Sequence, residues 1–420
     1  MPYLARFTVL VFCVGFTCCL GVAAAAADRP APPTTKSPTA KIETYVGADD
    51  EGYFAFNLWP AVAQPPASPL QLTVIFDTSA SQTGSFRQQG LAALETLLAE
   101  QSSESRVALV AADVQAVPLT SGFVPASSDE MQQALEQLRQ RVPLGATDMG
   151  GAIEAAVRLQ SQTELAGGLR RIAYIGDGVS SAGLISPARM RQLADRCVAL
   201  RMSVSSYAVG PQLDLPLLGA LAKHTGGMVV LDADEQGTRR PGAELAEAVR
   251  GAVLWPDAIA LPAGLRSAYF RDVPPLRFDR DTVVIGSFSA SQWQADKPQT
   301  IDVTAKLSGK PVELHFNAQA SGPSDDNAYL AELVTLAERD GGASLPTVDS
   351  AGLAELRKLV NSQARSLSRL SQQALAMGDL SQAKRLADRA SKIDPADPET
   401  AIVLTTLRKA GNTVDGQGPQ

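Results

Sequence analysis

Three short polar segments of the 420-residue chain contain oxygen-bearing side chains of the kinds that bind divalent cations. Mg²⁺ prefers oxygen ligands in near-octahedral geometry and retains several water molecules. If hydroxyls bind directly and carboxylates act through water, the ion stays electron-poor and attracts an anionic oxygen from outside. The predicted chemistry is therefore Mg²⁺-dependent binding of an Asp or Glu carboxylate of a protein partner, with Mn²⁺ or Ca²⁺ as alternative ions. The candidate ligands are Asp77, Ser79, Ser81, Thr147 and Asp177.

Each polar segment adjoins a predicted strand or helix. The first follows a strand expected at 72–76, the second precedes a helix expected at 149–160, and the third follows a strand expected at 171–175. In an open parallel sheet, ligands bind beyond the carboxyl ends of the strands, so the three segments are expected to converge. An Asp or Ser after a strand often only caps the next helix, and Asp148 is interpreted as such a helix-start residue. Three motifs in order favour metal binding over capping.

The elements expected between residues 70 and 253 alternate between strands and helices of about a dozen residues. This alternation predicts parallel pairing and hence an α/β fold with a doubly wound, mostly parallel sheet. The expected strands are 72–76, 106–112, 122–124, 171–175, 203–209 and 228–231. The expected helices are 86–99, 130–141, 149–160, 187–202, 216–224 and 243–253.

The pattern Asp77-x-Ser79-x-Ser81, followed by Thr147 and Asp177, resembles the five metal-site positions of the von Willebrand factor A family. The resemblance implies that both serines bind the ion directly and that Thr147 does so when a partner is bound. It also implies that the two aspartates act mostly through water. A metal-ion-dependent adhesion site of this kind would bind a partner and would not catalyse a reaction.

The resemblance extends over residues 70–253, whose predicted elements follow the family's order. Many members have Gly where this chain has Ala80 and Met where it has Gln82, but neither side chain is a ligand in the family. The lead-in Gly52-Tyr-Phe-Ala-Phe56, followed by prolines, is also loosely similar to inter-alpha-trypsin-inhibitor heavy chains and related bacterial secreted proteins.

A small β domain is predicted at 254–320. Its sequence alternates apolar and polar residues on both sides of Ser308-Gly-Lys-Pro311, which indicates a hairpin. The aromatic segment within 42–69 is expected to add a strand to this domain. The α/β domain would then be inserted between the two parts of the β domain.

Residues 326–411 have a helical pattern, and residues 412–420 are expected to be a disordered tail. Ala383, Ala390 and Pro395 have tetratricopeptide-like spacing, with Gly378 at a turn between helices. Only one repeat is visible, whereas stable stacks need about three. A plain helical hairpin is therefore the alternative interpretation.

Residues 1–27 are similar to a secretory signal peptide, because Arg6 precedes an apolar run that ends in alanines, with cleavage expected after Ala27. An uncleaved anchor is the alternative. The Pro-rich residues 28–41 predict a disordered linker. We expect an exported protein that is periplasmic, at the cell surface or secreted, without strong membrane association after cleavage. Cleavage would leave Cys197 as the single cysteine, so no internal disulfide is expected.

The net charge of −7 argues against a nucleic-acid partner, which needs a basic surface. No nucleophile-elbow or phosphate-loop motif is present, and neither His224 nor His315 has a neighbouring Cys or His to form a zinc site. We therefore expect a binding protein and no enzyme. One alternative is a structural envelope scaffold that acts through its C-terminal helices. The other is a metal-dependent phosphohydrolase with Asp77 as nucleophile, although Ser79 stands where that class usually has a second Asp.

Overall fold

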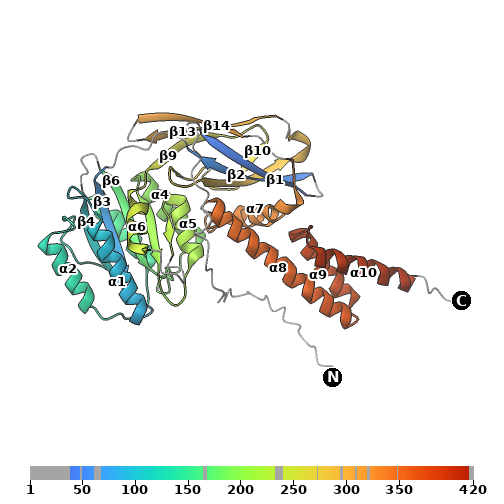
Figure 1. The fold of residues 1–420 in the computed structure, drawn as a ribbon, viewed down its shortest axis with the longest axis horizontal. Helices are drawn as coiled ribbons and strands as arrows, with labels where there is room; N and C mark the ends of the chain where they lie inside the picture. Colours follow the sequence, from blue (N-terminus) through green and yellow to red (C-terminus); the bar gives the residue numbers. More distant parts are fainter. Residues whose placement is uncertain are drawn as a thin grey trace, which may run out of the picture.

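A computed structural model of the chain contains two sheets and a C-terminal group of helices (Figure 1). The expected signal peptide and most of the expected linker lie outside the described residues. Among the described residues, none of the helices combines the length and the apolar character needed to cross a bilayer. The described ranges are 38–47, 50–60, 68–163, 168–231, 240–271, 273–293, 297–307, 310–318, 322–347 and 349–415.

The first sheet forms the α/β domain and has six strands in the order β5-β4-β3-β6-β7-β8. All neighbouring pairs are parallel except β4 and β5. The chain runs from β3 to β4 on one side and later returns to β6 on the other side of β3. The crevice where ligands bind in such sheets therefore lies beyond the carboxyl ends of β3 and β6. The strands are β3 (Leu70–Asp77), β4 (Arg106–Ala112), β5 (Ala116–Pro118), β6 (Leu169–Gly176), β7 (Ser203–Ala208) and β8 (Val229–Val230).

Helices cover both faces of this sheet, and each face has its own apolar core. Leu72, Val74 and Phe76 of β3 pack on the side of α1, α2 and α6. The side chain of Ile75 points to the opposite face of the strand and packs on the side of α3, α4 and α5. Burial on both faces explains why β3 has an almost continuous apolar run. The helices are α1 (Gly84–Ala99), α2 (Asp129–Gln140), α3 (Met149–Ser161), α4 (Pro187–Ala199), α5 (Leu215–Thr225) and α6 (Pro241–Arg250).

Two expectations for this domain were wrong in detail. The strand expected at 122–124 is absent, and Val124 makes only an isolated bridge to Val107. The short edge strand is β5 instead, which forms a hairpin with β4 and is too short for its alternation to be recognised in the sequence. Helix α6 ends at Arg250 rather than at 253, because Gly251 leaves the helical conformation and a strand begins at Val253.

The second sheet is built from residues on both sides of the α/β domain. Its order is β10-β12-β2-β1-β14-β13-β9-β11, and β1 pairs with β14 in parallel. The expected linker at 28–41 therefore ends too late, because residues from Thr39 onward belong to β1. The strands are β1 (Thr39–Val46), β2 (Glu51–Trp59), β9 (Val253–Ala260), β10 (Leu265–Ser267), β11 (Leu276–Arg277), β12 (Thr282–Ser289), β13 (Gln299–Leu307) and β14 (Lys310–Ala318).

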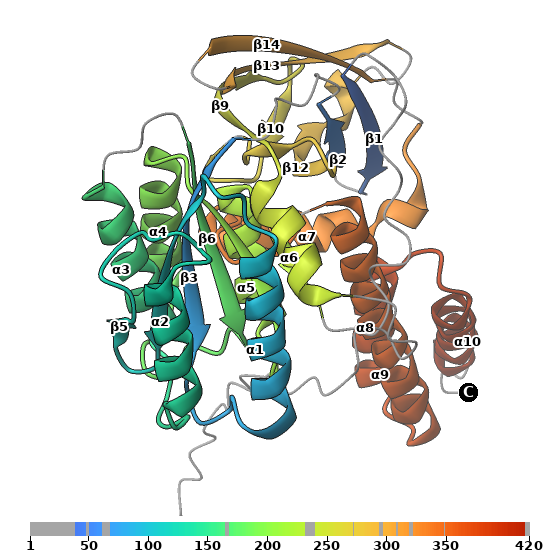
Figure 2. The same cartoon turned by 60° about the vertical axis from the view of Figure 1, so that its left-hand side comes forward.

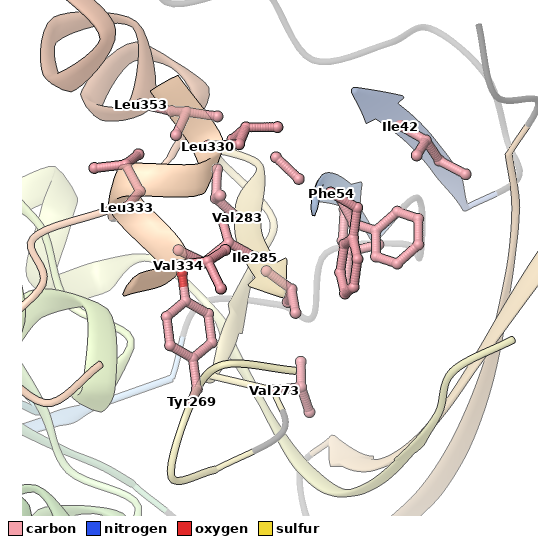
Figure 3. Close-up of a cluster of buried hydrophobic side chains, with 14 of the residues drawn as sticks. Ile42, Phe54, Tyr269, Val273, Val283, Ile285, Leu330, Leu333, Val334 and Leu353 are labelled. Atoms are coloured by element: carbon pink, nitrogen blue, oxygen red, sulfur yellow. The ribbon is translucent and has the colours of Figure 1, made fainter. Parts of the chain in front are cut away.

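The first C-terminal helix belongs to the core of this β sheet. Leu330 and Val334 of α7 (Tyr329–Asp340) pack with Val283, Ile285 and other apolar side chains of the sheet (Figure 3). The expected boundary at residue 326 therefore falls inside one packed unit. The short 3₁₀ segments Ala290–Gln292 and Asp325–Asn327 complete this unit, and we call the eight-stranded sheet with α7 the β unit.

The remaining helices extend from the β unit as a long hairpin and a further helix (Figure 1). Gly378, with φ of 82°, lies at the turn between α8 and α9, as the sequence predicted. The expected tail at 412–420 begins too early, since α10 continues to Asp415. The bounds are α7 (Tyr329–Asp340), α8 (Ser350–Ala376), α9 (Leu380–Ile393) and α10 (Pro398–Asp415).

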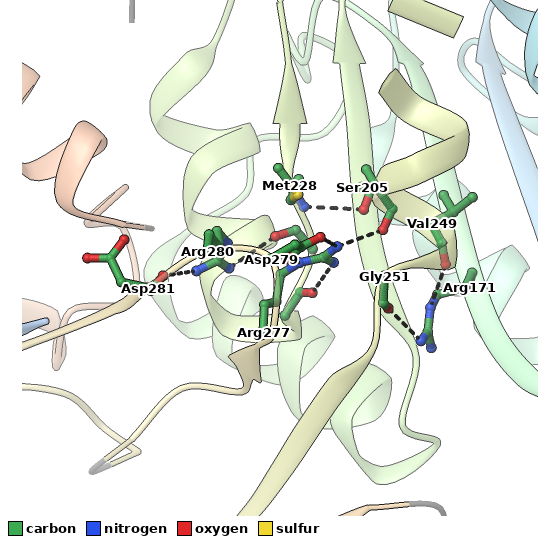
Figure 4. Close-up of polar contacts among 12 residues, drawn as sticks. Arg171, Ser205, Met228, Val249, Gly251, Arg277, Asp279, Arg280 and Asp281 are labelled. Atoms are coloured by element: carbon green, nitrogen blue, oxygen red, sulfur yellow. Dashed lines mark hydrogen bonds and ion pairs between the residues drawn. The ribbon is translucent and has the colours of Figure 1, made fainter. Parts of the chain in front are cut away.

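Three buried arginines lie where the α/β domain meets the second sheet, and two of them, Arg277 and Arg280, connect the two (Figure 4). Arg277 of β11 donates to the carbonyl oxygens of Gly226 and Ala248, each at 3.0 Å. Arg280 donates to Gly227 at 3.1 Å, and Arg171 of β6 to Val249 at 2.9 Å. These carbonyls lie at the C-terminal ends of α5 and α6, where a cation complements the helix dipole.

Candidate metal site

The three polar segments meet at the carboxyl end of the six-stranded sheet. Figure 2 shows β3 and β6 pointing away from the β unit, so the loops that follow them lie at the far end of the domain. Backbone hydrogen bonds join the first two segments, from Leu144 to Thr78 at 3.1 Å and from Ala80 to Gly145 at 3.0 Å. The backbone nitrogen of Ala182, on the loop after β6, donates to the carbonyl oxygen of Thr147 at 3.0 Å.

Asp77 is the innermost of the five candidate ligands and is fully buried. Its carboxylate accepts hydrogen bonds from the Ser79 nitrogen at 2.9 Å and from the Tyr174 hydroxyl at 2.8 Å. The Thr147 hydroxyl donates to both carboxylate oxygens, at 3.0 and 3.1 Å. Burial raises the pKa of Asp77, and the nearby Asp177 charge raises it further, while the bonds from Ser79 and Tyr174 oppose the shift.

The serine hydroxyls and the second carboxylate lie nearer to solvent. The Ser79 and Ser81 hydroxyl oxygens are 3.0 Å apart. Asp177 accepts a hydrogen bond from the Val179 nitrogen at 2.9 Å. Ser79, Ser81 and Asp177 line an open hollow of about 450 Å³, including space open to solvent. The structure thus brings together all five predicted residues, with Asp77 and Thr147 behind the other three. The remaining lining residues are Gly145, Val179, Ser181, Pro211 and Gln212.

Close backbone approach at Gly176 allows this arrangement. A Cβ at Gly176 would lie 2.5 Å from the Asp77 Cβ and 2.6 Å from the Tyr174 hydroxyl. A Cβ at Gly210 would lie 2.6 Å from the Asp177 Cβ. Glycine is therefore required at both positions to let the two aspartates lie side by side with the neighbouring loops.

Sequence reasoning missed several residues that support the site. Tyr174 holds Asp77, and Gln82 donates to the Val209 oxygen at 3.0 Å, which ties the first segment to the loop after β7. The only sequence signal for Tyr174 was a hydroxyl within an otherwise apolar strand. Asp148 caps α3 by accepting from the Gly151 nitrogen at 2.9 Å, in agreement with its interpretation as a helix-start residue.

The residues present fit a divalent cation. Two buried carboxylates lie close together, and among the described residues no Lys or Arg side chain forms an ion pair with either. Arg141, which precedes the second segment, is paired with Asp113 at 2.6 Å instead. Within the described ranges no three His, Cys, Asp or Glu side chains come together. A cation here would therefore depend on hydroxyl oxygens as well as carboxylates, the donor chemistry that suits Mg²⁺.

The other reactive residue types lie elsewhere. His224 is buried, with its Nε2 atom 2.9 Å from the Gly342 oxygen, and burial lowers its pKa to about 3. His224 is therefore neutral at physiological pH. His315 is exposed and lies 2.7 Å from Asp302. Cys197 is buried, which raises its pKa to about 12 and makes it inert.

Several solved structures resemble this chain at low sequence identity. A von Willebrand factor type A protein from Catenulispora acidiphila is 14% identical, covers 93% of this chain and 92% of its own, and has a TM-score of 0.45. The ArnB paralog VWA2 from Sulfolobus acidocaldarius is 12% identical, covers 88% of this chain and 98% of its own, and has a TM-score of 0.40. The manganese-loaded TRAP protein of Plasmodium vivax is 12% identical, covers 65% of this chain and 100% of its own, and has a TM-score of 0.36.

A family model identifies the central part of the chain. The model of the von Willebrand factor type A domain matches residues 70–231. This range contains β3 to β8, all five predicted site residues and the loops that bring them together. Residues 70–231 of this chain are a von Willebrand factor type A domain.

Proposed function

We propose that this chain is a metal-dependent binding protein that holds Mg²⁺ at the hollow and uses it to bind a carboxylate of a protein partner. The observation that carries the proposal is the pair of buried carboxylates, Asp77 and Asp177, beside a hollow lined by hydroxyls. Burial of an unpaired charge is costly, so a cation in the hollow would stabilise both carboxylates. Domains of this family commonly mediate metal-dependent protein binding.

Each residue has a distinct role in the proposal. Ser79 and Ser81 offer neutral oxygens at the solvent side, and Asp177 contributes negative charge there. Asp77 and Thr147 support them from behind through their mutual hydrogen bonds. A bound Mg²⁺ would supply a Lewis-acid centre for an anionic oxygen of the partner. Mn²⁺ or Ca²⁺ are alternative ions for the same donors.

We propose binding rather than catalysis. Asp77 occupies the position of an aspartyl nucleophile in the phosphohydrolase alternative. Its carboxylate is buried, however, and accepts hydrogen bonds from Ser79, Thr147 and Tyr174. These donors reduce its nucleophilicity, and its burial keeps a substrate away. The hollow is also lined by no histidine that would act as a general base.

We also propose that the protein acts outside the cytoplasm, because its first 27 residues are similar to a signal peptide. The competing proposal is an envelope scaffold whose C-terminal helices recruit the partner. The two proposals differ in whether partner binding needs the metal site.

Titration calorimetry and pull-down test the proposal together. Wild-type protein is expected to bind Mg²⁺ or Mn²⁺ and to retain partners from the envelope fraction in Mg²⁺ but not in EDTA. Asp77→Ala is expected to lose both activities. Asp302→Ala, which removes an exposed carboxylate of the β unit, is the control and should behave as wild type. If Asp77→Ala binds the partner equally well in EDTA and in Mg²⁺, the scaffold proposal replaces this one.

A further inference from the structure

Exposed apolar side chains gather around the hollow. The described residues include ten large apolar side chains that are well exposed, and five of them lie on the loops at the carboxyl end of the sheet. The other five lie on the C-terminal helices or, for Met377, directly after α8. Leu184 is 91% exposed, the highest value of the ten. The five on the loops, which we call the apolar rim, are Val114, Val142, Leu144, Leu184 and Leu213.

The rim residues adjoin residues that line the hollow. Val114 lies 3.8 Å from where a Cβ of Gly145 would be, and Gly145 is part of the lining. Leu144 directly precedes Gly145, and its nitrogen is bonded to the Thr78 oxygen at 3.1 Å. Leu213 directly follows the lining residue Gln212. The rim is therefore carried by several separate loops that surround one polar centre.

Leu184 is held at the same edge by its own loop. The backbone nitrogen of Ala182 donates to the carbonyl oxygen of Thr147 at 3.0 Å, and the Ser180 hydroxyl donates to the carbonyl oxygen of Gly183 at 2.6 Å. These bonds keep the loop in place while the leucine remains in solvent. Five exposed apolar side chains on the loops of one sheet edge differ from the scattered single residues of an ordinary surface, so the apolar rim indicates an interaction surface.

We infer that the partner presents an Asp or Glu directly flanked by apolar side chains. This inference rests on the proposed function and narrows the partner's chemistry. The acidic side chain would enter the hollow, whose lining combines the Ser79 and Ser81 hydroxyls and the Asp177 carboxylate with Val179 and Pro211. The residues on either side of that acid would contact the apolar rim. Contacts that surround a central group and exclude water from it are typical of the strongest part of a protein interface.

Peptides displayed on beads test the inference with full-length protein. One peptide carries a central Asp between leucines, the second a central Asp between serines, and the third a central Asn between leucines. We expect Mg²⁺-dependent binding of the first peptide to be at least about fivefold stronger than of the second, because partial burial of a leucine has about that effect. The third peptide should not bind, and EDTA should abolish binding of the first.

Rim variants locate the effect. Leu144→Ser and Leu184→Ser should each lose most of the preference for the leucine-flanked peptide while retaining Mn²⁺ affinity in calorimetry. Ile402→Ser removes a side chain that is 65% exposed on α10 and should leave the preference unchanged. Equal metal-dependent binding of both Asp peptides would overturn the inference and leave the proposed function intact. Absence of Mn²⁺ binding, or of any metal-dependent peptide binding, would overturn both.

Other occupants of the rim predict other results. If the rim binds a second copy of the chain, sedimentation should detect a wild-type dimer that Leu184→Ser dissociates, without a preference among peptides. If it binds a lipid surface, vesicles of anionic lipid should compete with the leucine-flanked peptide in Mg²⁺. Either result would overturn the inference.

Discussion

The two ends of the six-stranded sheet bury opposite charges and treat them differently. At the amino end, Arg171, Arg277 and Arg280 are buried and donate to carbonyl oxygens at the ends of α5 and α6 (Figure 4). At the carboxyl end, Asp77 and Asp177 are buried without an ion-pair partner among the described residues. The chain therefore supplies its own partners for the buried charges at the amino end of the sheet but not for those at the carboxyl end.

This difference distinguishes buried charges that stabilise the fold from buried charges that are available to bind a ligand. Burial and the neighbouring Arg277 lower the pKa of Arg171 to about 9, so it remains a cation at neutral pH. Carbonyl oxygens at the C-terminal end of α6 accept hydrogen bonds from that cation. The carboxylates receive hydrogen bonds but no opposite charge, and the hollow in front of them is open. Buried carboxylates without an opposite charge therefore indicate where a cation would bind.

The largest effect is expected at the arginine end. Arg277→Ala removes a buried cation and leaves Asp279 and two helix-end carbonyls without their donor. The free energy of unfolding should fall by about 3–5 kcal/mol. Arg266→Ala, at an exposed position of β10, should change it by less than about 0.5 kcal/mol. Urea unfolding followed by circular dichroism measures both, and similar losses for the two variants would contradict the role assigned to Arg277.

The next effect concerns the carboxylate end. At a Mg²⁺ concentration about 100 times the Kd, wild-type protein should gain about 2.7 kcal/mol of stability, because the ion binds only the folded state. Asp177→Asn should gain none, and in EDTA it should be at least as stable as wild type because one of two like charges is gone. Asp214→Asn changes a nearby carboxylate outside the lining and should retain the gain. Thermal unfolding with and without Mg²⁺ decides between these outcomes.

A smaller effect is expected when the backbone approach is blocked. Gly176→Ala places a Cβ 2.5 Å from the Asp77 Cβ and should lower stability by about 1–3 kcal/mol. Displacement of Asp77 should weaken Mn²⁺ binding as well. Gly122→Ala has no neighbour within 4 Å of the added Cβ and serves as control. Unchanged Mn²⁺ affinity in Gly176→Ala would argue against Asp77 as part of the metal site.

Removing one hydroxyl should have a subtler effect. Thr147→Ala keeps both carboxylates, so some metal binding should survive while partner binding weakens by about 1 kcal/mol. Thr147→Ser retains the hydroxyl and should bind almost as wild type. Calorimetry with Mn²⁺, followed by partner titration, measures the two steps separately. Loss of metal binding equal to that of Asp77→Ala would show that Thr147 is as important for the ion as the carboxylate.

The smallest effect is expected for the C-terminal end. Removing residues 398–420 deletes α10, which is remote from the hollow, and should leave Mn²⁺ affinity unchanged. A deletion from residue 326 is different, because it removes Leu330 and Val334 from the core of the β unit and should unfold that unit (Figure 3). Reduced metal affinity in a folded 398–420 deletion would indicate that α10 influences the site.

Local sequence determined the candidate site. Each motif lies within one contiguous run, with Asp77 at the end of an apolar strand and Asp177 just after another. Because parallel strands share a carboxyl edge, this local placement was enough to predict convergence. The alternation of strands and helices likewise predicted the doubly wound sheet. The short strand β5 was missed because three residues carry too little periodicity.

Only the tertiary structure decided which distant residues meet. The pairing of β1 with β14, the packing of α7 on the β sheet, and the contact of Arg277 with the ends of α5 and α6 all join segments far apart in the chain. Periodicity indicates which face of an element is buried but not which element covers it. For the same reason the sequence alone predicted five metal ligands, whereas the support from Tyr174 and the apolar rim emerged only when the loops were brought to one edge of the sheet.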